Sequence, residues 1–173
     1  MSRRAAWVAV AALSLELIAL AVWVGGLVVL VGAVIPAVFN TFGGQDAGGF
    51  FLTRTFEGYN RLVVAAIAAL VLSMVYRWWS GDQAIAVWRG EIILVTMMSL
   101  IAGVIILVLH PQAAALQSQA FALKDELAKK AAFEAFFRLH MPLRSLYIVN
   151  LLLGMVLMVL KVKRAWENQG DVT

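Results

Sequence analysis

His110 and His140 are the residues of this sequence best suited to bind a ligand, and the 173-residue chain contains no other histidine. His110 lies in the stretch VLHPQ at the end of one apolar segment, and His140 lies in RLHMPLR at the start of the next. Two imidazoles with a carboxylate such as Glu57 could bind a divalent metal, copper included. On neighbouring helices the two rings could also ligate haem iron from opposite sides.

The segments that carry these histidines have the composition of membrane spans. The chain is 63% hydrophobic and 14% charged, whereas a soluble domain is roughly 45–50% apolar and about 25% charged. Four apolar segments approach the roughly 20 residues that cross a bilayer. We therefore predict an all-α fold, an antiparallel four-helix bundle integral to the membrane. It forms a single domain over residues 1–173, with spans at about 14–38, 60–79, 88–110 and 140–162.

A long polar segment between the third and fourth spans is predicted to be an amphipathic cap helix over about residues 112–139. It has no Gly or Pro beyond Pro111 and is rich in Ala, Leu, Glu and Lys, which favour helices. Leu116, Leu123 and Leu127 recur at helical spacing and form an apolar stripe. Such a helix would lie on the membrane or cap the bundle.

Small and polar residues within the spans are expected to face neighbouring helices, because lipid offers no hydrogen bonds. Their spacing places them on one side of each predicted helix, and these sides are expected to converge near the histidines. The expected packing positions are Gly25, Gly26, Gly32, Pro36, Gly103 and Gly154. The candidate ligand or metal residues are His110, His140 and Glu57, with support from Arg54, Arg61, Arg144, Tyr147 and Asn150.

Each of these residues also has a structural interpretation. His110 could cap the C-terminal end of its span, where a cationic or hydrogen-bonding side chain suits the helix dipole. His140 could anchor the membrane boundary beside Arg138 and Arg144, and Asn150 could simply bond a neighbouring helix. Glu16 is interpreted as the interfacial end of the first span.

The charge distribution argues against nucleic acid as a partner. The formal net charge is +4, but Lys and Arg cluster at the ends of the apolar segments, as membrane-flanking residues do. The basic cluster from Lys161 to Arg164 lies close to a span end, so we expect both termini in the cytoplasm and the protein in the cytoplasmic (inner) membrane of a bacterium. No cysteine is present, and no motif of a nucleotide-binding loop, hydrolase or zinc protease supports an enzyme.

Several stretches of the chain resemble the transmembrane protein 205-like family of unknown function, which consists of small four-span membrane proteins. They are Trp23-Val24-Gly25-Gly26, Val34-Ile35-Pro36-Ala37-Val38-Phe39, Phe56 to Tyr59, and Phe137-Arg138-Leu139-His140 with Asn150 and Gly154. The resemblance implies a four-helix membrane bundle and makes the region around His140 a feature of the family, but it implies no activity. A fainter similarity links the chain to the CopD type of copper-resistance membrane domain.

Three functions remain open from the sequence. The first is the binding of a metal, haem or small anionic ligand at one membrane face through the two histidines. The second is a structural or accessory role in a membrane complex, with the amphipathic segment docked on a partner. The third is transport of an ion or small solute by a homo-oligomer, which would depend on Asn150 inside the bilayer.

Overall fold

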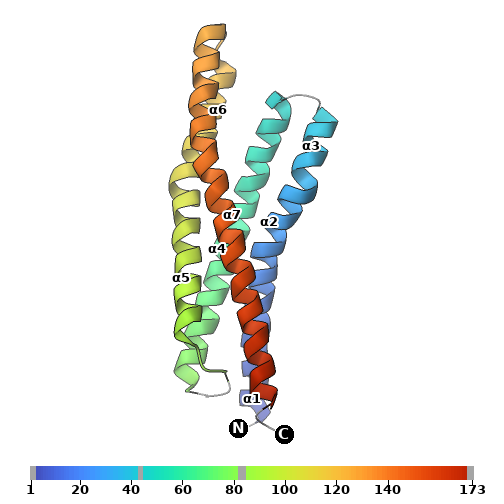
Figure 1. The fold of residues 1–173 in the computed structure, drawn as a ribbon, viewed down its shortest axis with the longest axis vertical. Helices are drawn as coiled ribbons and strands as arrows, with labels where there is room; N and C mark the ends of the chain where they lie inside the picture. Colours follow the sequence, from blue (N-terminus) through green and yellow to red (C-terminus); the bar gives the residue numbers. More distant parts are fainter. Residues whose placement is uncertain (1–2, 43–44, 82–84, 171–173) are drawn as a thin grey trace.

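Four long helical segments run antiparallel along the molecule, with both termini at the same end (Figure 1). The computed structural model describes residues 3–42, 45–81 and 85–170, and contains no strand within them. The first segment comprises α1 (Arg3–Leu20), η1 (Ala21–Gly25), α2 (Gly26–Val29), η2 (Leu30–Val34) and α3 (Ile35–Phe42). The others are α4 (Gln45–Ser80), then α5 (Arg89–Val104) with η4 (Ile105–Leu109) and α6 (His110–Ala122), and finally α7 (Glu126–Gly170).

All four segments are long and apolar enough to cross a membrane. They cover Trp7–Phe42, Gly48–Ser80, Arg89–Ala122 and Glu126–Arg164, with hydropathy between 1.9 and 3.0 in their most apolar windows. The prediction of four spans is thus confirmed by length and composition. Each helix is longer than predicted, since the charged residues at its ends continue the helix instead of ending it.

Two of these segments contain a π-helical turn immediately before a proline. The N–H of Ile35, which precedes Pro36, donates to the carbonyl of Leu30, and the N–H of His110, which precedes Pro111, donates to Ile105. Proline cannot donate, and its ring clashes with the carbonyl four residues earlier. In both segments a bond that reaches five residues back precedes the proline, and the helix continues through it. The helix therefore continues beyond His110, where we place the end of the third span from the sequence.

The single cap helix predicted over residues 112–139 is also wrong. α6 ends at Ala122, Leu123 is extended (φ −76°, ψ 132°), and α7 begins at Glu126. The break needs no Gly or Pro, because Asp125 caps the new helix: its carboxylate accepts from the N–H of Ala128 at 2.8 Å. α6 and the first part of α7 thus form a helical hairpin that prolongs the third and fourth spans.

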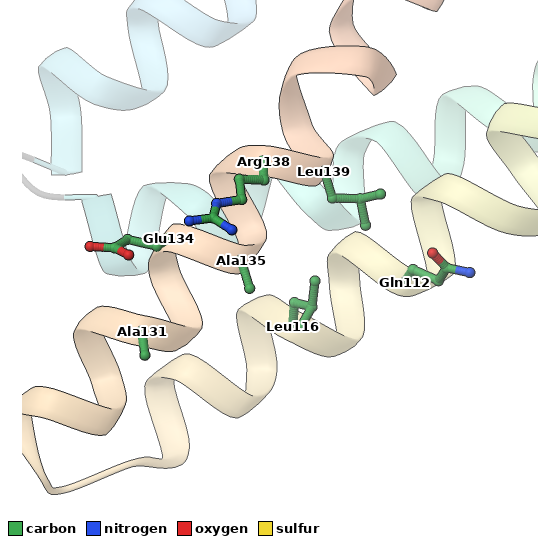
Figure 2. Close-up of a pocket in the computed structure, with 7 residues that line it drawn as sticks. All are labelled: Gln112, Leu116, Ala131, Glu134, Ala135, Arg138 and Leu139. Carbon is green, nitrogen blue, oxygen red and sulfur yellow. The ribbon is translucent and has the colours of Figure 1, made fainter.

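A shallow groove runs between the two helices of this hairpin (Figure 2). Leu116 of α6 points toward Ala135 and Leu139 of α7, so part of the apolar stripe predicted from the sequence packs within the hairpin. Leu127, another member of the stripe, is instead exposed near the tip of the hairpin.

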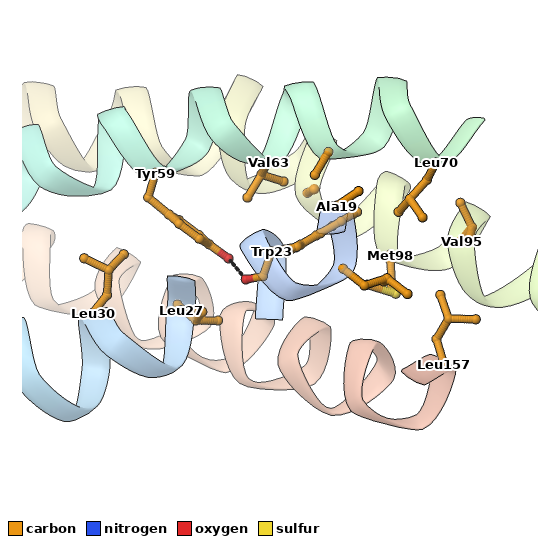
Figure 3. Close-up of a cluster of buried hydrophobic side chains, with 13 residues drawn as sticks. Ala19, Trp23, Leu27, Leu30, Tyr59, Val63, Leu70, Val95, Met98 and Leu157 are labelled. Atoms are coloured by element: carbon orange, nitrogen blue, oxygen red, sulfur yellow. Dashed lines mark hydrogen bonds between the residues drawn. The ribbon is translucent and has the colours of Figure 1, made fainter. Parts of the chain in front are cut away.

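The core that joins the four segments is built from apolar residues three and four positions apart. Leu20, Trp23, Leu27 and Leu30 line the first segment, matching rows come from α4 and α5, and α7 contributes Leu157 (Figure 3). The remaining buried members are Ala19, Tyr59, Val63, Ala66, Leu70, Val95, Met98, Ala102 and Leu157. These positions give the first segment, α4 and α5 one apolar face each toward their neighbours.

Tyr59 marks the end of this core that lies nearer the histidines. Its hydroxyl donates to the carbonyl of Trp23 at 2.7 Å, across the interface between η1 and α4 (Figure 3). A Cβ at Gly26 would lie 3.0 Å from the Tyr59 ring, so glycine at this position lets the ring pack against the first segment.

We expect Asp125→Ala to loosen the start of α7, because it removes the acceptor for the Ala128 N–H. Loss of an N-cap destabilises a helix end by about 1 kcal/mol, so amide hydrogen exchange at residues 126–129 should accelerate about fivefold. Asp125→Asn keeps an acceptor and serves as the control. Equal exchange in wild type and Asp125→Ala would contradict the capping role.

Candidate functional site

A cavity of about 490 Å³ lies between α4 and the η4–α6 segment, at the end of the bundle opposite the termini. Its polar lining comprises Thr53, Arg54, Glu57, Asn60, Arg61, His110, Gln117 and Ser118. Its volume lies within the roughly 300–1,000 Å³ of typical small-molecule sites. This is the part of the predicted site that the structure brings together.

The charged rim of the cavity comes from one face of α4. Glu57 pairs with Arg54 at 3.0 Å and with Arg61 at 2.7 Å, as expected for residues three and four positions apart on a helix. Each guanidinium uses one nitrogen for Glu57 and has five N–H donors in all. Two positive charges against one negative leave the rim with a net charge of +1, so the rim favours anions.

Asn60 brings an unused hydrogen-bond donor to the cavity. The residue is 4% exposed and lines the cavity, and its Nδ2 has no partner in the described structure. Its Oδ1 accepts a hydrogen bond of 2.9 Å from the Tyr147 hydroxyl of α7. Tyr147 itself packs against Phe56 and Tyr59. The aromatic cluster thus fixes the amide of Asn60.

The two histidines occupy different surroundings. His110 lines the cavity together with Glu57 and Asn60. His140 does not line it; its ring stacks on Phe136 of the same helix, with centroids 5.4 Å apart. Among the described residues, neither imidazole ring has a hydrogen-bond partner.

The other candidates are spread along the bundle. Asn150 is 3% exposed and donates to the carbonyl of Met98 on α5 at 3.2 Å, whereas Arg144 is exposed. Gly154 lies in a close contact, because a Cβ there would approach Val24 to 2.6 Å. The Cβ positions of Gly25, Gly32 and Gly103 have nothing within 4 Å.

The chemistry available in the cavity is that of hydrogen-bond donors and positive charge. Arg54, Arg61 and the Asn60 amide can donate, and His110 can donate or accept. Within the described part of the chain, no three His, Asp or Glu side chains are grouped as a metal site would require. The arrangement is suited to an anionic or hydrogen-bond-accepting ligand.

A second polar cluster, which sequence reasoning missed, lies toward the end of the bundle that carries the termini. Each helical segment contributes one charged residue: Glu16 from α1, Arg77 from α4, Glu91 from α5 and Lys161 from α7. We call these four residues the charge quartet. The carboxylates are at most 1% exposed, so Glu16 is buried between the helices.

Every charge of the quartet is neutralised within it. The Nη1 of Arg77 donates to Glu16 Oε2 and to Glu91 Oε1, each at 2.7 Å, and Lys161 Nζ also donates to both carboxylates. The Nε of Arg77 donates to the carbonyl of Ile85 at 2.8 Å. Two positive and two negative charges sum to zero, which removes most of the penalty of placing charges among apolar helices.

A signal for the quartet was present in the sequence. Arg77, Glu91 and Lys161 all lie where their spans approach the same membrane face, and Glu16 lies in the first span on the side of that face. Because Arg77 and Lys161 lie at the ends of apolar segments, they also fit the pattern of membrane-flanking cations, which conceals their pairing. Treating a carboxylate inside an apolar segment as one member of a buried pair would have led to its partners.

Comparison with known proteins assigns the chain to a family without assigning an activity. A family model described as a domain of unknown function (DUF4149) matches residues 18–122, more than half of the chain. The match includes every residue that lines the cavity. No curated protein and no solved structure matches the chain. The family is one of unknown function, as the resemblance implied, and nothing singles out transmembrane protein 205-like or CopD-type proteins.

We expect the quartet to respond to substitution as one unit. Lys161→Met leaves a buried net charge of −1 and Glu16→Gln leaves +1, so each should destabilise the fold by about 3–5 kcal/mol. The double variant restores neutrality through Arg77 and Glu91, and should lose clearly less than the sum of the two single variants. Unfolding in detergent, followed by circular dichroism, measures these differences.

Lys163→Met provides the control, because Lys163 lies two residues along α7 and its side chain is 66% exposed. This variant should unfold close to wild type. Strict additivity of the two quartet substitutions would show that the four charges do not act together.

Proposed function

The chain belongs to the DUF4149 family, and we propose that it is a membrane protein that binds a small anionic ligand in the cavity between α4 and α6. The four apolar segments support the location in a membrane. The charges and hydrogen-bond donors of the cavity support the binding function. Of the ligand classes considered from the sequence, an anion fits these donors best.

The unpartnered Nδ2 of Asn60 carries this proposal. A buried amide donor without a partner costs roughly 1–3 kcal/mol relative to a satisfied one. The loss is recovered when a ligand supplies an acceptor, so the bound form would be more stable than the free form. Because Tyr147 holds the Oδ1 of Asn60, the free side of the amide offers a donor, not an acceptor.

Arg54, Arg61 and His110 would complete the binding site. Guanidinium groups bind carboxylate and phosphate oxygens through paired N–H donors, and both arginines have donors beyond those used by Glu57. Glu57 would hold the two side chains at the rim, while His110 faces the same space from α6. A metal or a haem ligated by both histidines is less well supported, since only His110 lines the cavity.

We also propose that the termini lie on the cytoplasmic side. Lys163 and Arg164 are exposed close to the end of the fourth span, and Trp78, Trp79 and Trp166 are more than 70% exposed at the same end of the bundle. Exposed tryptophans mark the membrane interface, and basic residues beside short connections favour the cytoplasm. This arrangement would place the cavity toward the opposite face of the membrane.

We expect Asn60→Leu to reduce binding of an anionic ligand at least tenfold, because it replaces the free donor with an apolar group of similar size. Dodecyl phosphate is a suitable probe, since its phosphate can accept from Asn60 and from both arginines. Native mass spectrometry of the purified protein, released from detergent micelles, measures the fraction of protein that retains the probe.

Asn150→Leu is the matched control for this experiment. It removes a second buried asparagine that also makes one interhelical hydrogen bond but does not line the cavity. This variant should retain the probe like wild type. Equal retention by Asn60→Leu and Asn150→Leu, or no retention by wild type, would contradict the proposed function and favour the accessory or transport role.

A further inference from the structure

The lining of the cavity changes in character along the bundle axis. Gln117, Ser118 and Arg54 lie toward its outer end, and Asn60, Arg61 and His110 lie farther in. Beyond them the lining ends in the aliphatic pair Val64 and Ile106. Phe50 and Val64 are 14 positions apart on α4, or roughly 21 Å at the helical rise. The cavity is therefore an elongated site whose polar side chains lie toward the outer end, together with Phe50, and whose inner end is aliphatic.

The apolar end lies beside the surface that would contact lipid. Val64 lines the cavity and yet is 52% exposed, on a stretch of α4 whose neighbour Leu62 is also exposed. Across the cavity, Leu107 and Val108 of η4 follow Ile106 and are exposed as well. Lipid chains would thus surround the inner end of the site, while the arginines at its rim lie nearer the membrane surface.

Resting on the proposed function, we infer that the ligand is a lipid-like amphiphile that enters the cavity from the membrane. Its phosphate or carboxylate head lies among Asn60, Arg61 and His110, and its alkyl chain passes Val64 and Ile106 toward the bilayer centre. The polar part of the cavity then matches the head and the apolar end matches the chain. A fully hydrophilic anion would leave Val64 and Ile106 in contact with water.

The direction of the alkyl chain follows from the contacts between α4 and α6. The Thr53 hydroxyl bonds the Gln117 side chain, and the rings of Phe50 and Phe121 lie 4.6 Å apart, so α4 and α6 are joined at the outer end. A Cβ at Gly49 would lie 2.6 Å from Gln117, which shows how closely the two helices approach there. Because these contacts join the two helices at the outer end, the alkyl chain would leave the cavity past Val64.

Three probes separate this inference from the proposed function: dodecyl phosphate, inorganic phosphate and dodecanol. We expect wild type to retain dodecyl phosphate at least tenfold more than either of the others in native mass spectrometry. Equal retention of inorganic phosphate, lost in Asn60→Leu, would overturn the amphiphile while sustaining anion binding. Equal retention of dodecanol would show that the protein does not recognise the anionic head group, and would contradict the proposed function. Retention of none would contradict both.

Val64→Trp tests the path of the ligand's alkyl chain. The larger side chain should obstruct the apolar end and reduce dodecyl phosphate retention at least tenfold, and an exposed position tolerates it without disturbing the core. Val71→Trp is the matched control, seven residues further along the same face of α4, 43% exposed and outside the cavity. It should behave as wild type. Full retention by Val64→Trp would show that no chain passes Val64.

Discussion

The mutual neutralisation of Glu16, Arg77, Glu91 and Lys161 is the constraint on which the bundle depends. Each residue comes from a different helical segment, and each carboxylate is bonded by both cations. An isolated charge among apolar helices is costly, so the four spans are stable together only when all four charges meet. A shift of one helix along its axis would move the charge that it carries away from the two opposite charges that it bonds. The quartet therefore fixes both the arrangement and the register of the helices.

The rest of the core follows from this fixed register. Ser73 on α4 donates to the carbonyl of Ala12 near the quartet, and Tyr59 donates to that of Trp23 toward the cavity. Between these bonds, apolar rows three and four residues apart pack with small residues where helices approach, as at Gly26 and Gly154. The apolar rows alone would tolerate sliding, because successive turns present similar surfaces. The polar contacts at the two ends select one alignment.

Local signals in the sequence predicted the helices and part of the site. Apolar segments long enough to span a membrane gave four antiparallel helices, and Glu57 does pair with Arg54 and Arg61, its neighbours by helical spacing. The quartet depends on partners such as Glu16 and Lys161, which lie 145 residues apart, and helical spacing says nothing of such pairs. The helix through Pro111 and the break at Asp125 were missed because π turns and side-chain caps override the usual meaning of proline and of helix-forming residues.

The contrast between the two polar clusters indicates where a ligand would act. In the quartet every carboxylate and cation has partners, so a ligand there would have to displace a bond already made. In the cavity the Asn60 donor is unused, and space lies beside it. The Oδ1 of Asn150 and the Oγ of Ser99 are also without partners, but neither residue lines the cavity, so neither has comparable room for a ligand. An unsatisfied donor and an accessible volume occur together at Asn60, and an acceptor bound there would stabilise the bundle at the end that the quartet does not reach.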